Sequence, residues 1–119
     1  MVIHRLAFCI TLIAAGPSWA CGILEHAEPK VGSVANGSPT RITLTFSQAL
    51  VPAESHIVLE DSNNRQTPLG KASVGEEDTV LSQAPSAPLP PGTYKVIWYA
   101  SWKDCQSQTQ GSYKFTVEP

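Results

Sequence analysis

Two stretches near the end of the chain alternate between side chains suited to a buried face and side chains suited to an exposed face of a strand. This alternation constrains the fold more than any other feature. Residues 94, 96, 98 and 100 are Tyr, Val, Trp and Ala, and the pattern returns over residues 113–117. A period of two is typical of a strand with one buried face. The residues between the two stretches are mostly polar and include Asp104 and Cys105. The sequence therefore predicts a hairpin whose loop carries an acid and a thiol.

Shorter alternating segments precede this hairpin, at residues 22–27, 42–47, 56–61 and 79–81. Ten prolines and eight glycines punctuate the chain, and almost no segment has helical periodicity. Residues 84–91 contain four prolines, which cannot donate to a sheet ladder and so exclude a central strand there. About seven short strands predict an all-β fold, an Ig-like Greek-key β-sandwich or a small barrel.

Residues 1–20 are predicted to be a cleavable signal peptide. They combine a short positive start, an apolar run over residues 6–15 that is too short to span a bilayer, and a small-x-small pattern ending at Ala20. Cleavage there leaves one domain of residues 21–119, which holds no run long enough to be transmembrane. A lipid-modified Cys21 is the alternative, although the bulky residue before Ala20 fits that pattern poorly.

The net charge of the processed chain limits the kinds of partner that it can bind. Only one of the eight Lys and Arg residues precedes residue 21, so seven basic residues face ten acidic ones, a formal charge of −3. A mildly acidic surface argues against nucleic acid and anionic membranes as partners.

Two cysteines remain in the processed chain, Cys21 and Cys105. An even count in a small exported chain favours a disulfide, with two unpaired thiols as the alternative.

Motifs of catalysis are missing from the sequence. It contains no G-x-S-x-G, no H-E-x-x-H and no phosphate-cradling glycine loop, so we predict that the protein is not an enzyme. The acidic run Glu76–Asp78 lacks the alternating oxygen ligands of a calcium loop and is interpreted as a solvated loop. His56 opens a predicted strand and is interpreted as a surface residue.

Three aromatic residues of the hairpin have separate predicted roles. Tyr94 follows Pro91 and Gly92 in the manner of a tyrosine corner, in which the hydroxyl bonds back to the backbone. Trp98 is predicted to pack between the two sheets. Trp102 stands where the alternation breaks. It is predicted to be either a partly exposed cover over Cys105 or a contact for a partner.

Several short motifs keep a fixed order along the chain. P-x-x-G-S and F-S lie in the first part, and P-G-x-Y-x-V-x-W, a following Asp and G-x-x-x-F-x-V lie in the last. The residues that carry them are Leu24, Pro29, Gly32, Ser33, Phe46, Ser47, Pro91, Gly92, Tyr94, Val96, Trp98, Asp104, Gly111, Phe115 and Val117. In this arrangement residues 21–117 resemble the CopC/PcoC family of periplasmic copper-resistance proteins. The resemblance implies a role in copper homeostasis and an inner-membrane copper transporter as partner.

The resemblance also implies a copper site with altered ligands. In the family, Cu(II) is held by an N-terminal His, through its amine and imidazole, and by the Asp and His of an S-x-D-x-H loop. When this ligand set is carried onto the present chain, Asp104 matches the aspartate of the family, whereas Cys21 and Gln106 stand at the positions of the two histidines. The family's methionine-rich Cu(I) segment has no counterpart, because Met1 is the only methionine. His26 lies on the same segment as Cys21 and is a further candidate ligand.

The family fold would bring Cys21 beside Cys105. The resemblance therefore implies a disulfide at the position of the family's metal site. The alternative keeps both thiols reduced, as soft ligands suited to Cu(I). Two functions stay open. One is a copper-binding protein with Asp104, Cys21 and His26 as ligands of Cu(II) or Cu(I). The other is a disulfide-stapled Ig-like interaction module that has lost the metal.

Overall fold

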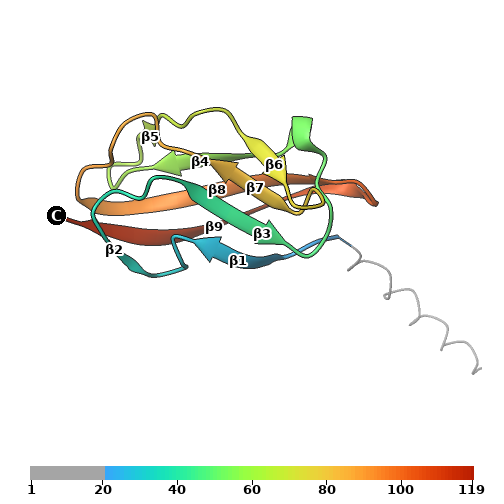
Figure 1. The fold of residues 1–119 in the computed structure, drawn as a ribbon, viewed down its shortest axis with the longest axis horizontal. Coiled ribbons are helices and arrows are strands. Elements are labelled where there is room, and N and C mark those ends of the chain that lie inside the picture. The colour runs from blue at the N-terminus through green and yellow to red at the C-terminus, as the bar shows by residue number, and fades with distance from the viewer. Residues whose placement is uncertain (1–20) are drawn as a thin grey trace, which may run out of the picture.

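The computed structural model describes residues 21–119, which form two β-sheets packed face to face (Figure 1). One sheet has the strand order β1-β3-β7-β6 and the other the order β2-β9-β8-β4-β5. The strands are β1 (Leu24–Glu28), β2 (Val34–Asn36), β3 (Ile42–Phe46), β4 (His56–Glu60), β5 (Gln66–Thr67), β6 (Ser73–Gly75), β7 (Val80–Gln83), β8 (Gly92–Trp102) and β9 (Cys105–Glu118). One turn of 3-10 helix, η3 (Pro52–Glu54), precedes β4.

The two open sheets confirm the predicted all-β sandwich, and they do not close into a barrel. All pairings between these strands are antiparallel except that of β2 with β9. No helix within residues 21–119 is long and apolar enough to cross a membrane. The predicted signal peptide lies outside the described residues, so the boundary at residue 21 remains a prediction.

Alternate side chains of the central strands fill the space between the sheets. Those buried from β3, β8 and β9 are Ile42, Leu44, Phe46, Tyr94, Val96, Ala100, Trp102, Tyr113, Phe115 and Val117. Burying each large apolar side chain stabilises the fold by about 1.5–3 kcal/mol. The period of two seen in the sequence thus marks the inner faces of both sheets.

The roles predicted for Tyr94 and Trp98 are confirmed. The Tyr94 hydroxyl donates to the Pro90 carbonyl oxygen at 2.6 Å, which ties the start of β8 to the preceding connector. Trp98 packs edge-to-face against Phe46, with ring centroids 5.1 Å apart. It also covers Gly111 of β9, where a Cβ atom would collide with the indole ring. Only glycine at position 111 leaves room for this tryptophan.

The hairpin differs from the prediction in the length of its second strand. Strands β8 and β9 pair from Gly92 opposite Val117 to Ser101 opposite Gln108, and after a bulge Trp102 lies opposite Cys105. The predicted polar loop is therefore mostly strand, and only two residues connect β8 to β9. Its polar residues did not reveal a strand because this part of β9 buries little and is held by backbone pairing with β8.

Candidate functional site

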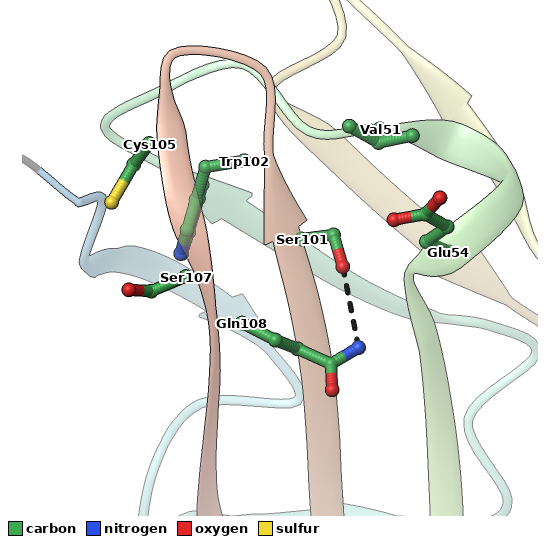
Figure 2. A pocket seen from close by; sticks show the side chains of 7 residues that line it. All are labelled: Val51, Glu54, Ser101, Trp102, Cys105, Ser107 and Gln108. Atoms are coloured by element: carbon green, nitrogen blue, oxygen red, sulfur yellow. Dashed lines mark hydrogen bonds between the residues drawn. The ribbon is translucent and has the colours of Figure 1, made fainter.

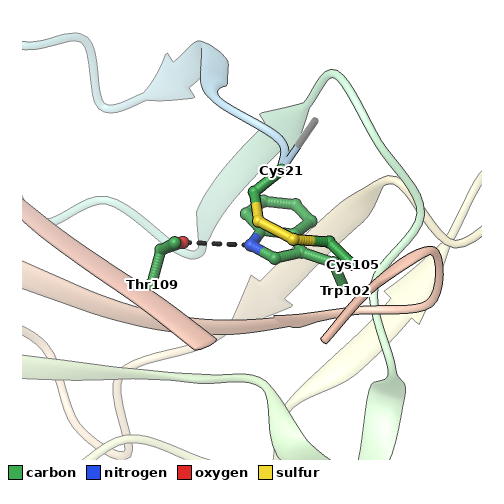
Figure 3. The surroundings of a disulfide bond; sticks show 4 residues. All are labelled: Cys21, Trp102, Cys105 and Thr109. Atoms are coloured by element: carbon green, nitrogen blue, oxygen red, sulfur yellow. Dashed lines mark hydrogen bonds between the residues drawn. A yellow bond between two sulfur atoms is a disulfide. The ribbon is translucent and has the colours of Figure 1, made fainter. Parts of the chain in front are cut away.

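A disulfide joins the two segments of the described chain that the resemblance associates with copper. Cys21 precedes β1 and Cys105 is the first residue of β9, 84 positions later. Their Cα atoms lie 5.5 Å apart (Figure 3). Both residues are half-buried and pack against the hydrophobic core. The bond therefore fastens the N-terminal segment of one sheet to the hairpin of the other.

Trp102 lies beside this disulfide (Figure 3) and is only 4% exposed. Its Nε1 donates to the Thr109 hydroxyl at 3.1 Å, and its ring meets Phe46 edge-to-face with centroids 5.5 Å apart. A Cβ atom at Gly22 would lie 2.5 Å from Trp102 Cζ3, so glycine is required beside the ring. The predicted partly exposed cover or partner contact was wrong, because the indole is a core side chain under the disulfide.

Asp104 lies in the two-residue turn directly before Cys105 and is exposed. The turn is anchored through its other residue. Lys103 forms an ion pair with Asp78 of the β6–β7 turn, and its backbone N–H donates to the Ala49 carbonyl at 3.0 Å. The structure thus holds an exposed carboxylate next to the disulfide, on a turn fixed from two sides.

The two histidines of the described chain lie elsewhere. His26 is exposed on β1, opposite Thr45 of β3. His56 is exposed on β4 and stacks on Tyr99 of β8, with centroids 4.8 Å apart. Within residues 21–119 no three or more His, Cys, Asp or Glu side chains converge as metal ligands would. The assignment of Asp104, Cys21 and His26 as metal ligands stays a prediction.

A polar pocket of about 460 Å³ opens beside the disulfide (Figure 2). Val51 and Glu54 line it from the segment around η3, and the β8–β9 hairpin supplies the other lining residues, Ser101, Trp102, Cys105, Ser107 and Gln108. Gln108 Nε2 donates to the Ser101 hydroxyl at 3.2 Å across its wall. The pocket gives solvent a path to Cys105. Sequence reasoning missed it because its residues come from two segments that lie far apart in the sequence.

Residues 24–118 match the CopC domain. The chain belongs to the CopC family. Copper resistance protein C of Pseudomonas syringae pv. tomato is 35% identical over 130 aligned positions, which cover 99% of this chain and 100% of that protein. The predicted family is therefore confirmed.

Solved structures of the family share the fold. PcoC, a methionine-rich copper resistance protein from Escherichia coli, has 29% identity and a TM-score of 0.74, covering 83% of this chain and 100% of that one. CopC from Methylosinus trichosporium OB3b has 28% identity and a TM-score of 0.76, covering 83% of this chain and 95% of that one. Unlike the methionine-rich PcoC, this chain has a single methionine, Met1.

Proposed function

We propose that this CopC-family protein is an exported copper-binding protein of copper homeostasis, whose affinity for copper depends on the thiol state of Cys21 and Cys105. One observation carries the proposal. The disulfide lies next to Asp104, and one of its cysteines occupies the position where the resemblance expects a histidine ligand. The same two sulfurs can therefore stabilise the fold or bind a metal ion.

With the disulfide formed, the available donors fit Cu(II) poorly. Cu(II) favours a tetragonal set of nitrogen and oxygen ligands. The oxidised protein offers the Asp104 carboxylate, the α-amine of Cys21 after cleavage, and the imidazole of His26. No cluster of three or more His, Cys, Asp or Glu ligands supports such a set in the described part of the chain. We expect weak Cu(II) binding in this state.

Reduction changes the donor set. A dithiol reductant supplies two electrons and two protons, the S–S bond breaks, and Cys21 and Cys105 become thiols. Thiolates are soft ligands and suit Cu(I). With Cα atoms 5.5 Å apart, the two sulfurs are close enough to bind one ion together. The cysteines would then supply the soft ligands that methionines provide in a methionine-rich relative.

The test is a competition titration with Cu(I) against a chromophoric chelator under anaerobic conditions. It compares the oxidised protein, the protein reduced and freed of reductant, and the Cys21→Ser/Cys105→Ser variant. We expect the reduced protein to bind at least about tenfold more tightly than the other two, a difference of about 1.4 kcal/mol. Equal affinities in all three samples would contradict the proposal.

Family membership supports a location and a partner for the protein. We infer that the protein acts in the periplasm after removal of residues 1–20, and that it exchanges copper with an inner-membrane transporter. Intact-mass analysis of protein from the periplasmic fraction, with and without reductant and alkylation, tests the first step. It reports an N-terminus at Cys21, any attached lipid and the thiol state together.

A second function is favoured by the disulfide and by the lack of a three-ligand cluster in residues 21–119. In this alternative the protein is a disulfide-stapled Ig-like interaction module that has lost copper. The Cu(I) titration and a parallel titration with Cu(II) separate the two functions, because a folded protein that binds neither ion in either thiol state supports the interaction module.

A further inference from the structure

One segment of backbone is bonded to both of the chain segments that carry the disulfide. This segment is the connector between β3 and η3, residues 47–51. It forms hydrogen bonds with Ile23, which lies just after Cys21, and with Lys103, which lies just before Cys105. The connector therefore holds the two cysteine-bearing segments together through contacts that involve no sulfur atom.

On the N-terminal side the contact is a reciprocal pair of hydrogen bonds between Ile23 and Ser47. The Ile23 N–H donates to the Ser47 hydroxyl at 2.9 Å, and the Ser47 N–H donates to the Ile23 carbonyl at 2.9 Å. Within the adjoining ladder of β1 and β3, Leu24 lies opposite Phe46. The pair thus extends that ladder by one residue toward Cys21.

Packing holds the same segment at the residue next to Cys21. Gly22 is buried, and a Cβ atom there would lie 2.5 Å from Trp102 Cζ3 and 3.0 Å from Gln48 Cβ. The indole ring is itself fixed, because its Nε1 donates to the Thr109 hydroxyl (Figure 3). Gly22 is therefore enclosed between the connector and a core tryptophan.

On the side of the hairpin the connector bonds to the end of β8 and to the turn after it. The Val51 N–H donates to the Ser101 carbonyl at 2.8 Å, and the Lys103 N–H donates to the Ala49 carbonyl at 3.0 Å. Cys105 follows directly after this turn, as the first residue of β9. Both cysteines thus lie within two residues of an anchor on the same connector.

We propose that reduction of the disulfide leaves Cys21 beside Cys105, so that the reduced protein presents a preformed pair of thiols to a single thiophilic centre. This inference deepens the proposed function and rests on it for the reduced state. The anchored Cα atoms lie 5.5 Å apart, so little chain entropy remains to be lost when both sulfurs bind one centre. Ser47 is the positioning residue, because its hydroxyl holds the N-terminal segment.

Phenylarsine oxide is the probe for the paired thiols. Its trivalent arsenic binds two thiols, forming two As–S bonds and releasing one water molecule without a change in oxidation state. It is titrated into copper-free protein that has been reduced and freed of reductant. We expect one arsenic per chain and an affinity at least about a hundredfold higher than that of the Cys21→Ser variant. Equal affinities would overturn the proposal, because they would show that the two sulfurs do not converge.

Proton NMR of the same reduced protein tests whether the N-terminal segment stays in place. Because Gly22 packs against the indole of Trp102, the ring current shifts its α-proton resonances away from the usual position for glycine. We expect this shift to persist after reduction. Resonances at the usual position, or a reduced protein that is unfolded, would overturn the proposal.

Ser47→Ala tests the anchor. In the reduced protein the N–H of residue 47 should exchange with solvent about twofold to tenfold faster, the contribution of one hydrogen bond. Ser47→Thr keeps a hydroxyl and should exchange at nearly the original rate. Ser33→Ala is the matched control, because it also removes a hydroxyl that donates to a backbone carbonyl, that of Lys30 at 2.7 Å.

Equal exchange in the Ser47→Ala and Ser33→Ala variants would contradict the role of Ser47 and overturn the proposed anchor. Every sample is free of copper, so these results are separate from those of the Cu(I) titration. A preformed thiol pair that binds arsenic but not Cu(I) would contradict the proposed function and leave this inference standing.

Discussion

At the scale of single residues, substitutions are tolerated least where a glycine contacts an indole ring. Gly22 touches Trp102 beside the disulfide, and Gly111 touches Trp98 between the sheets. Neither contact leaves space for a methyl group. These two glycines are fixed by packing. Gly75 differs from them, because a methyl group there would have no atom within 4 Å and the backbone conformation is an ordinary one.

Gly22→Ala should lower the free energy of unfolding by about 1–3 kcal/mol, because the new methyl forces Trp102 out of its position. Thermal unfolding followed by circular dichroism measures the loss. Gly75→Ala is the matched control and should change the melting temperature little. Equal effects of the two substitutions would show that the contact of Gly22 with Trp102 does not constrain the fold.

Tyr113 makes stability depend on alkaline pH. Burial, with a smaller contribution from Glu28, raises the pKa of Tyr113 above its ordinary value of 10.0, and its hydroxyl donates to the Pro29 carbonyl at 2.8 Å. Above about pH 10 the unfolded chain loses this proton while the folded protein keeps it, so the free energy of unfolding falls as pH rises.

Urea denaturation at about pH 8 and about pH 11 measures this dependence. Tyr113→Phe should reduce the fall in the free energy of unfolding between the two values. It should also lower stability at pH 8 by about 1–3 kcal/mol, because the Pro29 carbonyl loses its donor. Tyr99→Phe, at a half-buried residue of the same strand pair, is the control. An unchanged pH dependence in Tyr113→Phe would exclude Tyr113 as its source.

At the scale of strands, one buried amide links the two sheets. Gln83 at the end of β7 is 6% exposed. Its Oε1 accepts from the Ile57 N–H of β4 at 2.6 Å, and its Nε2 donates to the Gly70 carbonyl at 2.9 Å. The side chain thus satisfies two backbone groups that would otherwise be buried without partners.

Gln83→Leu should lower the free energy of unfolding by about 2–5 kcal/mol, because two buried polar groups lose their partners at about 1–3 kcal/mol each. Chemical denaturation measures it. Ser82→Ala, at the preceding and half-buried position of β7, should cost less than about 1 kcal/mol. A loss no larger than that of the serine variant would contradict the role assigned to Gln83.

Longer strands that bury one face were predictable from the sequence, and the shortest strands were not. The alternation over residues 42–46 and 94–101 reflects side chains that fill the core, so the period of two was visible. Strands β2, β5 and β6 have only two or three residues and bury none of them completely. Their positions depend on backbone pairing with distant partners, which local sequence does not encode.

The candidate site was predictable only through the resemblance of the chain to a known family. The resemblance paired Cys21 with Cys105 and put Asp104 beside them, and the structure has this arrangement. The burial of Trp102 was not foreseen, because its position at the break in the alternation gave no sign of the disulfide and Gly22 around it. The pocket depends on contacts between segments far apart in the sequence.

At the scale of the whole molecule, the disulfide closes most of the chain into one loop. It links residues 84 positions apart, which on the chain-entropy account stabilises the fold by at most about 4.5 kcal/mol. Any use of these cysteines to bind copper therefore competes with their contribution to stability. We expect the reduced protein to be folded but distinctly less stable.

Replacing both cysteines by serine should lower the free energy of unfolding by about 2–5 kcal/mol and the melting temperature by at least about 10 °C. Differential scanning calorimetry measures the change. Reduction of the unmodified protein should give a similar loss. Full alkylation of both thiols in native protein without reductant would show that the bond does not form in the native protein.

The central claim is that the disulfide stands where the resemblance to the CopC family places a Cu(II) site, and a competition titration with Cu(II) tests it most directly. The samples are the oxidised protein and a variant carrying Cys21→His, Gln106→His and Cys105→Ser, which avoids a free thiol. Two imidazoles beside Asp104 should raise the Cu(II) affinity by at least about a hundredfold, or about 2.8 kcal/mol. Tight Cu(II) binding by the oxidised protein, or no gain in the variant, would contradict the claim.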